Sequence, residues 1–199
     1  SARFGWSDDR TQEEARAEEL AHKALSIDPS HGGPYNLLAN ISLQRRQYDE
    51  AIAYGEKAVA LAPNNSSLVA LLGRTLVYAG RPDEALPLIE QAIRLSPNTP
   101  PNVLRFEGQA YHAMGQYEEA IVAFGRARAR NPKGVLPLVW LAMTYADMGR
   151  MKEGRAMAQE VLKLDRNFSA KRFVNGLTFK DHTKIERALT TLRQLGLPD

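Results

Sequence analysis

Residues 101–134 read PNVLRFEGQAYHAMGQYEEAIVAFGRARARNPKG, and this stretch decides the fold. Apolar residues recur three and four positions apart in both of its halves, which is typical of amphipathic helices. Gly115 stands between the halves, where a helix ends most easily in a left-handed glycine. Pro132 stops the second half, because proline cannot continue the hydrogen-bond ladder of a helix. The stretch therefore predicts a pair of antiparallel helices.

The same arrangement returns along the chain at a nearly constant period. Pro29, Pro63, Pro97 and Pro132 are separated by 34, 34 and 35 residues, and a further step of 34 reaches Arg166 in a similar segment. A repeat of this period is the signature of a helical solenoid, in which each unit packs only on its neighbours. We therefore predict an all-α fold, an α-solenoid of antiparallel helix pairs.

The prolines divide the chain into the units of one array. We expect a partial repeat 1 at residues 1–31, repeat 2 at 32–65, repeat 3 at 66–100, repeat 4 at 101–134, repeat 5 at 135–168 and a degenerate capping repeat at 169–199. In the last unit, Ala188, Leu192 and Leu195 keep the apolar register of the repeat. Arrays need such ends, because the last apolar face must be covered by a more polar unit.

The first unit looks incomplete, since most of its first helix is missing. Residues 11–14 read Thr-Gln-Glu-Glu, a capping box, so we expect the helix of this unit to begin near residue 12. Phe4 and Trp6 either pack on that helix or mark where upstream protein docks, and the sequence leaves both open. Because the chain starts at Ser1 without a methionine, we expect it to be a piece of a longer protein.

Small residues at matching places in a unit, such as Gly73 and Ala85, should let its two helices approach closely. Two positions depart from the pattern. Gly154 stands where the second helix usually has alanine, and Pro87 lies within the expected second helix of repeat 3. A proline there predicts a late helix start or a local kink.

Composition narrows the class of protein. Hydrophobic residues make up 44% of the 199 residues, enough for a packed core, and the absence of cysteine excludes disulfides and thiolate metal sites. No apolar run reaches the roughly 18–20 residues that cross a bilayer, so we expect no membrane insertion and a cytoplasmic location. Residues 1–100 carry 10 basic and 13 acidic residues, and residues 101–199 carry 16 and 10, a net −3 against +6. A basic half suits acidic partners, although solvated helix faces explain the imbalance more simply.

The repeat resembles the tetratricopeptide repeat (TPR) family, whose pattern is W-x2-L-G-x2-Y … A-x3-F … P. The match is closest in residues 101–134, through Leu104, Gly108, Tyr111, Ala120, Phe124 and Pro132. The resemblance covers nearly the whole chain. It implies a right-handed superhelix and a non-catalytic scaffold, whose first helices line a concave groove that binds a protein or peptide.

The family pattern also implies which residues face the groove. They are Asn36, Asn40 and Gln44 in repeat 2, Ser67, Arg74 and Tyr78 in repeat 3, Asn102, Arg105, Gln109 and His112 in repeat 4, and Met143 and Asp147 in repeat 5, with Trp140 close by. Their amides can hydrogen-bond a peptide backbone, or they can simply be solvated on a curved surface. Arg74 and Arg105 suit a carboxylate. Leu71 and Phe106 stand where the clamp of chaperone-binding members needs basic or amide residues, so we do not expect recognition of a chaperone C-terminus.

The tail carries a second resemblance. Residues 179–199 read FKDHTKIERALTTLRQLGLPD, similar to the closing segment of TPR regions in multidomain bacterial proteins with an adenylate/guanylate cyclase or DNA-binding domain upstream. His182 replaces the proline usual there. This resemblance implies a regulatory module of a larger bacterial signalling protein.

The sequence contains no catalytic constellation. The four histidines form no metal-binding motif, and neither a nucleophile elbow nor a phosphate loop is present, so we expect no enzyme activity, cofactor or metal. The basic cluster Arg126, Arg128, Arg130 and Lys133 lacks the interleaved aromatic residues of nucleic-acid sites, so a nucleic-acid partner is not expected. Two functions remain: a groove-binding scaffold, or an intramolecular regulatory or oligomerisation module. Self-association stays open, because the first helix can expose an apolar face.

Overall fold

The computed structural model describes the backbone from residue 5 to residue 199 and the side chains from residue 12 onward. Within this range the chain is helical and contains no strand, which confirms the predicted all-α solenoid. The helices are α1 (Gly5–Ile27), α2 (Gly32–Gln44), α3 (Tyr48–Leu61), α4 (Ser66–Tyr78), α5 (Pro82–Leu95), α6 (Pro101–Ala113), α7 (Tyr117–Arg130), α8 (Val135–Asp147), α9 (Met151–Leu164), α10 (Ala170–Asn175) and α11 (His182–Gln194).

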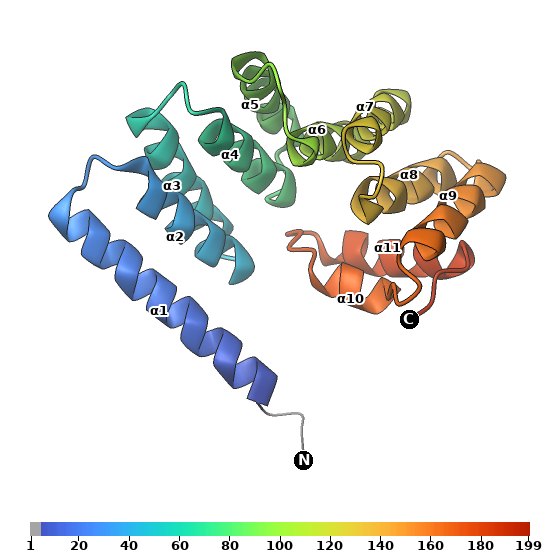
Figure 1. Cartoon of the computed structure of the whole chain (residues 1–199), viewed down its shortest axis with the longest axis horizontal. Coiled ribbons are helices and arrows are strands. Elements are labelled where there is room, and N and C mark those ends of the chain that lie inside the picture. The colour runs from blue at the N-terminus through green and yellow to red at the C-terminus, as the bar shows by residue number, and fades with distance from the viewer. Residues whose placement is uncertain (1–4) are drawn as a thin grey trace.

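Four consecutive helix pairs form the array: α2 with α3, α4 with α5, α6 with α7 and α8 with α9. The second helix of each pair packs on the first helix of the next pair. The pairs follow a curve, and α10 and α11 lie on its inner side beneath α8 (Figure 1). The first helices α4, α6 and α8 therefore face the inside of the curve.

Glycines allow the two helices of a pair to approach closely, as the sequence predicts. A Cβ atom added to Gly73 would lie 2.5 Å from Cγ1 of Ile89, and one added to Gly108 would lie 2.5 Å from Cε1 of Phe124. Both neighbours are completely buried. A larger residue at either glycine would push the helices apart.

The end of the first helix in each pair has a left-handed residue. Gly115 has a φ angle of 76°, which confirms the helix stop predicted there, and Gly80 and Gly149 hold the same place in their pairs with φ of 83° and 77°. The equivalent residue after α2 is Arg46, with φ of 61°. This conformation is unfavourable for any residue with a Cβ atom, so Arg46 needs compensation from its surroundings.

The first helix differs from the expectation, because α1 begins at Gly5 and not near residue 12. No glycine or proline interrupts residues 6–27, and glutamate, arginine and alanine favour a continuous helix, so the capping box inside this run does not mark the start of the helix. Helix α1 packs on α2. Phe4 and the side chain of Trp6 lie outside the part of the chain that the structure describes, and so do the two interpretations of these residues. The side chain of Thr11 lies outside it as well.

Pro87 lies inside α5, which begins at Pro82, so the predicted late start is wrong and the alternative of a local kink stays a prediction. Pro82 already begins the helix, because proline is tolerated in the first turn where its missing N–H has no partner to lose. Asp83 and Glu84 add negative charge at the same end.

The C-terminal unit folds back on the array. Helix α10 has only 6 residues, and α11 packs against α10 and α8. A Cβ atom on Gly154 would lie 2.8 Å from Cδ2 of Leu195, so the glycine at this position leaves room for the end of the cap. The amide of Ala170 donates to the carbonyl of Pro198 at 2.7 Å, which ties the two ends of the unit together.

Candidate partner-binding groove

A short segment of the chain itself lies on the inner face of the array. It comprises residues 177–180, between α10 and α11, and is called the inner loop below. Leu177, Thr178 and Phe179 are buried there, although they belong to a connection between helices. A buried loop must find partners for its backbone groups, and those of the inner loop come from distant repeats.

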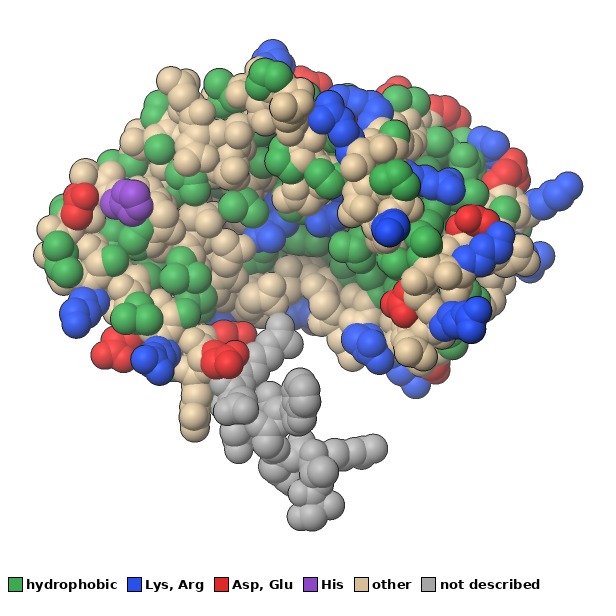
Figure 2. Space-filling view, viewed as in Figure 1, with side chains coloured by type: hydrophobic (Ala, Val, Ile, Leu, Met, Phe, Trp, Pro, Cys, Tyr) green, Lys and Arg blue, Asp and Glu red, His purple; other side chains and the backbone are tan. Residues whose placement is uncertain are grey.

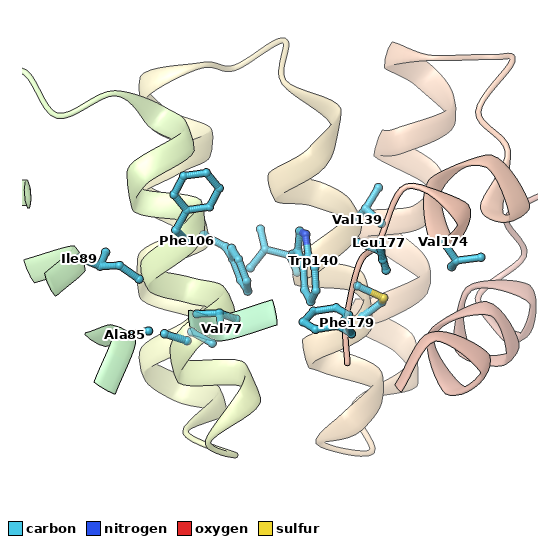
Figure 3. Close-up of a cluster of buried hydrophobic side chains, with 14 of the residues drawn as sticks. Val77, Ala85, Ile89, Phe106, Val139, Trp140, Val174, Leu177 and Phe179 are labelled. Carbon is cyan, nitrogen blue, oxygen red and sulfur yellow. The ribbon is translucent and has the colours of Figure 1, made fainter. Parts of the chain in front are cut away.

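Polar contacts from two earlier repeats hold the inner loop. The amide of Lys180 donates to the carbonyl of Tyr78 at 2.8 Å, and Nη1 of Arg46 donates to the carbonyl of Phe179 at 3.0 Å. The Phe179 ring lies beside Trp140 of α8 (Figure 3). Its centroid is 4.8 Å from that of Tyr78 and 6.2 Å from that of Trp140, and both pairs meet edge to face.

The left-handed conformation of Arg46 directs its side chain towards this loop. Nη2 of Arg46 lies 3.5 Å from the carbonyl of Leu177, and Nη1 lies 3.4 Å from Nε2 of His182. These contacts join the end of α2 to residues more than 130 positions later in the sequence. They supply the compensation that a non-glycine residue needs at this place.

Two of the cavities beside the inner loop share Gln109 and Trp140. The first, of about 330 Å³, includes Phe179 in its wall, and the second, of about 440 Å³, includes Leu177. The loop therefore fills only part of the inner face. Figure 2 shows this face as a hollow in which hydrophobic and basic side chains meet.

The first cavity contains a charged cluster. Nε2 of His112 lies 3.0 Å from Oδ2 of Asp147, and Nη2 of Arg187 donates to Oδ1 of Asp147 at 2.5 Å. Burial raises the pKa of Asp147, but the hydrogen bond and charge of His112 and the charge of Arg187 outweigh burial, so the pKa is lowered overall. Arg187 belongs to α11, so part of this predicted surface is occupied by the cap.

A second polar group lies between the repeats at the centre of the array. Nη2 of Arg74 donates to Oδ1 of Asn40. With its amide oxygen turned towards these donors, Gln109 accepts from Nε1 of Trp140 at 3.1 Å and from Nη1 of Arg105 at 3.2 Å. The guanidinium groups of Arg74 and Arg105 lie 5.8 Å and 4.8 Å from the centroid of the Phe106 ring.

The structure brings most of the predicted groove residues into these groups. Tyr78, Arg105, Gln109, His112, Met143 and Asp147 line one or both cavities, with Trp140. Arg74 and Asn40 adjoin them through the Phe106 ring and their mutual hydrogen bond. Asn36 is half-buried and accepts from Nδ2 of Asn40 through its carbonyl, whereas Gln44, Ser67 and Asn102 are exposed and lie outside both groups.

Sequence reasoning missed the inner loop and Arg46. A signal for Arg46 was present, because arginine stands where the other repeats have glycine. Residues 177–180 carried no such signal, since nothing in their composition separates them from an ordinary connection. Arg187 was also missed, because it reaches Asp147 only when α11 folds back.

Arg126 of the basic cluster donates to Oε2 of Glu107 at 3.0 Å. Among the described residues, no three histidine or acidic side chains gather where they could hold a metal ion. None of the described helices is long and apolar enough to cross a membrane.

Comparison with known proteins agrees with the architecture. The tetratricopeptide repeat family model matches residues 12–74 and 111–173, and the model of the anaphase-promoting complex, cyclosome, subunit 3 matches residues 44–127. No curated protein sequence matches the chain at a significant level.

Several solved structures share the fold. PilW, a widely conserved type IV pilus biogenesis factor, is 20% identical with a TM-score of 0.77, covering 96% of this chain and 84% of that one. TTC0263, a thermophilic TPR protein of Thermus thermophilus, is 22% identical with a TM-score of 0.71, covering 96% of both chains. YrrB, a TPR protein with an unusual peptide-binding site, is 24% identical with a TM-score of 0.61, covering 80% of this chain and 81% of that one.

The helix pairs, their left-handed stops and their period agree with the family model over more than half of the residues. The chain belongs to the tetratricopeptide repeat family.

Proposed function

We propose that this chain is a non-catalytic cytoplasmic scaffold that binds an extended peptide, or an extended segment of a partner domain, in its concave groove. The observation that carries this proposal is the inner loop, since the groove already holds a non-helical segment of the same chain. A TPR protein of similar fold, YrrB, has a peptide-binding site. The predicted groove residues Asn36, Asn40, Gln44, Arg74, Tyr78, Asn102, Arg105, Gln109, His112, Met143 and Asp147 are the proposed contact surface.

The inner loop indicates how such a peptide would be held. Main-chain hydrogen bonds to the Tyr78 carbonyl and from the Arg46 guanidinium recognise backbone of any sequence. An aromatic side chain between Tyr78 and Trp140 provides the anchor. Backbone pairing combined with a side-chain pocket is a general way to recognise extended peptides.

A labelled peptide that copies residues 174–183 tests the proposal by fluorescence anisotropy. We expect it to bind the Phe179→Ala full chain at least tenfold more tightly than the wild type. The reason is that the wild-type segment competes at an effective concentration of about 1 mM or more. The same peptide with alanine in place of phenylalanine is the matched probe and should bind neither protein.

A variant with one shortened side chain outside the groove is the protein control. Leu164→Ala removes an exposed side chain of α9 and should behave as wild type. If the phenylalanine and alanine peptides bind the Phe179→Ala chain equally, or neither binds, the groove does not accept an extended segment in trans and the proposal is wrong.

A second candidate is an intramolecular regulatory or oligomerisation module of a larger bacterial signalling protein. The chain's own inner loop occupies the groove, which favours this candidate because the groove already binds a segment of the same chain. The tail resemblance of residues 179–199 also supports a regulatory module. Sedimentation over a hundredfold concentration range tests the oligomerisation part. A mass that doubles would support it, and a constant monomer mass would contradict it.

A further inference from the structure

The connection that leads into the cap (residues 169–199) differs from every earlier connection between units. Each of the four earlier connections contains a proline at the equivalent place: Pro29, Pro63, Pro97 and Pro132. Between α9 and α10 this place holds Arg166, and residues 155–175 contain neither glycine nor proline. The chain can therefore run from α9 into α10 as one continuous helix, which a proline at position 166 would prevent.

The turn at this connection has the same geometry as the proline turns. The amide of Phe168 donates to the carbonyl of Asp165 at 3.2 Å. In the proline turn after α7, the amide of Gly134 donates in the same way to the carbonyl of Asn131 at 2.9 Å. Asp165 has φ −136° and ψ 95°, close to the −138° and 81° of Asn131. A proline would fit this turn, so arginine leaves the connection free to straighten without altering the folded turn.

The cap is held together by contacts within itself. Helix α10 packs on α11, and the amide of Ala170 donates to the carbonyl of Pro198 at 2.7 Å. Asp199 accepts from Arg193 at 2.7 Å and pairs with Lys171 at 2.9 Å. These contacts all lie within residues 169–199, so they persist when the connection changes direction.

The contacts of the cap and its connection with the array are strongly apolar. The buried side chains that contribute to them include Phe168, Val174, Leu177, Phe179, Leu192 and Leu195. Undocking the cap of a single chain would expose these side chains to water. A second copy removes this penalty, because its array offers the same partners, among them Arg46, Tyr78 and Asp147.

We propose that the partner of the groove is the cap of a second copy, and that two chains exchange caps through the connection at residues 165–169. This names a partner for the proposed groove and rests on that function. Each chain gives one cap and receives one, so the pair closes with two-fold symmetry. In the exchanged dimer Phe179 of one copy lies between Tyr78 and Trp140 of the other, and the second chain completes the groove.

Refolding from denaturant over a hundredfold range of protein concentration, followed by size-exclusion chromatography at one common dilution, tests the exchange. We expect the wild type to form a dimer whose fraction rises with the refolding concentration. The dimer should persist after dilution, because both caps must undock before the chains separate. Arg166→Pro should lower the dimer fraction at least tenfold, since proline keeps the turn and blocks the continuous helix.

Arg166→Ala is the matched control. It removes the same exposed side chain and leaves the connection free, so its dimer fraction should equal that of the wild type. Among the described residues, the amide of Arg166 donates no hydrogen bond. Arg166→Pro should therefore unfold at the same temperature as the wild type or higher, and a lost dimer does not reflect a damaged monomer.

Filtered NMR spectra locate the cap without any substitution. Wild-type dimers are formed from a mixture of ¹³C-labelled and unlabelled chains. We expect NOEs between the Phe179 ring of one chain and the Tyr78 ring of the other, since these ring centroids lie 4.8 Å apart. The monomer fraction of the same mixture should show no NOE between chains.

Three results would overturn the exchange. They are a wild type that stays monomeric at every refolding concentration, a dimer without NOEs between the Phe179 and Tyr78 rings of different chains, and equal dimer fractions for Arg166→Pro and Arg166→Ala. If the inner-loop peptide binds the Phe179→Ala chain and the wild type forms no dimer, the exchange fails while the groove function stands. If the peptide does not bind and no dimer forms, both proposals fail.

Discussion

Two buried carboxylates in this array respond oppositely to their surroundings. Asp147 interacts with His112 and Arg187, and its pKa is lowered despite burial. Glu107 is also buried, but its pKa is raised, because burial exceeds the effect of the Arg126 charge. Arg126 is half exposed, and solvent weakens its interaction with Glu107. Asp147 has two basic partners and Glu107 has one, so the number of partners decides the direction.

This difference predicts opposite pH dependence in two variants. The contribution of Asp147 to the free energy of unfolding is present above its ordinary value of 3.8 and is lost as the pH falls through its lower folded value. The Asp147→Asn variant should therefore be less stable than the wild type at neutral pH, and the gap should close below about pH 4.

For Glu107 the sign is reversed. Its folded pKa is raised above the ordinary value of 4.5, so its contribution is present below that value and is lost as the pH rises through the folded value. Glu107→Gln should gain stability relative to the wild type between about pH 4 and pH 7. Urea unfolding midpoints at several pH values give both profiles. Curves parallel to the wild type would show that neither carboxylate titrates differently in the folded chain.

At the scale of one element, the end of α2 differs from the ends of α4, α6 and α8. The stop residue after α2 is Arg46, and its left-handed backbone should cost about 1 kcal/mol relative to glycine. Its hydrogen bond to the Phe179 carbonyl should return about 1 kcal/mol. The two contributions nearly cancel, so the long-range hydrogen bond compensates for the unfavourable backbone conformation of Arg46.

Two substitutions separate these effects. We expect Arg46→Gly to leave the free energy of unfolding nearly unchanged, because relief of the backbone compensates for the lost hydrogen bond. Arg46→Ala keeps the strain and loses the bond, so it should be about 1 kcal/mol less stable. Denaturant unfolding measures both.

The equivalent residue after α4 is the control. A Cβ atom on Gly80 would meet nothing within 4 Å, and its φ of 83° is left-handed. Gly80→Ala should therefore cost about 1 kcal/mol from backbone conformation alone. Equal stability of the glycine and alanine variants of Arg46 would contradict the proposed strain.

At the scale of the whole molecule, the inner loop adds contacts that a simple array lacks. Repeat proteins are stabilised mainly by neighbouring units, so distant repeats can unfold separately. Here Arg46 and Tyr78 bind residues of the C-terminal unit, and α11 packs back on α8. The loop therefore couples the second and third repeats directly to the end of the chain.

Removal of the loop anchor should reduce both stability and cooperativity. Phe179→Ala empties the space between Tyr78 and Trp140 and should cost about 3 kcal/mol or more. We also expect a lower denaturant m-value, because the uncoupled ends can unfold in separate steps. Fluorescence and circular dichroism should then give different midpoints. An unchanged m-value with coincident midpoints would mean that the loop adds stability without coupling the repeats.

The sequence by itself determined the fold class, because the repeat is a local property. The period of the prolines, the apolar spacing and the glycines at Gly80, Gly115 and Gly149 each act within one unit or between neighbours. Such short-range rules are readable from a single chain. The resemblance to the repeat family implied an inner-face position for Arg105, Gln109 and Asp147, and these residues line the two cavities there.

The occupation of the groove and the pairing of its charges follow from long-range packing and not from the repeat pattern. The inner loop reaches Arg46 and Tyr78 because α11 turns back on α8, and this turn depends on contacts such as Leu195 against Gly154. Whether Arg74 and Arg105 meet a carboxylate likewise depends on every chain segment around them. Contacts between residues more than 130 positions apart follow no local period, so the physical reason is that their partners are fixed by packing and not by spacing.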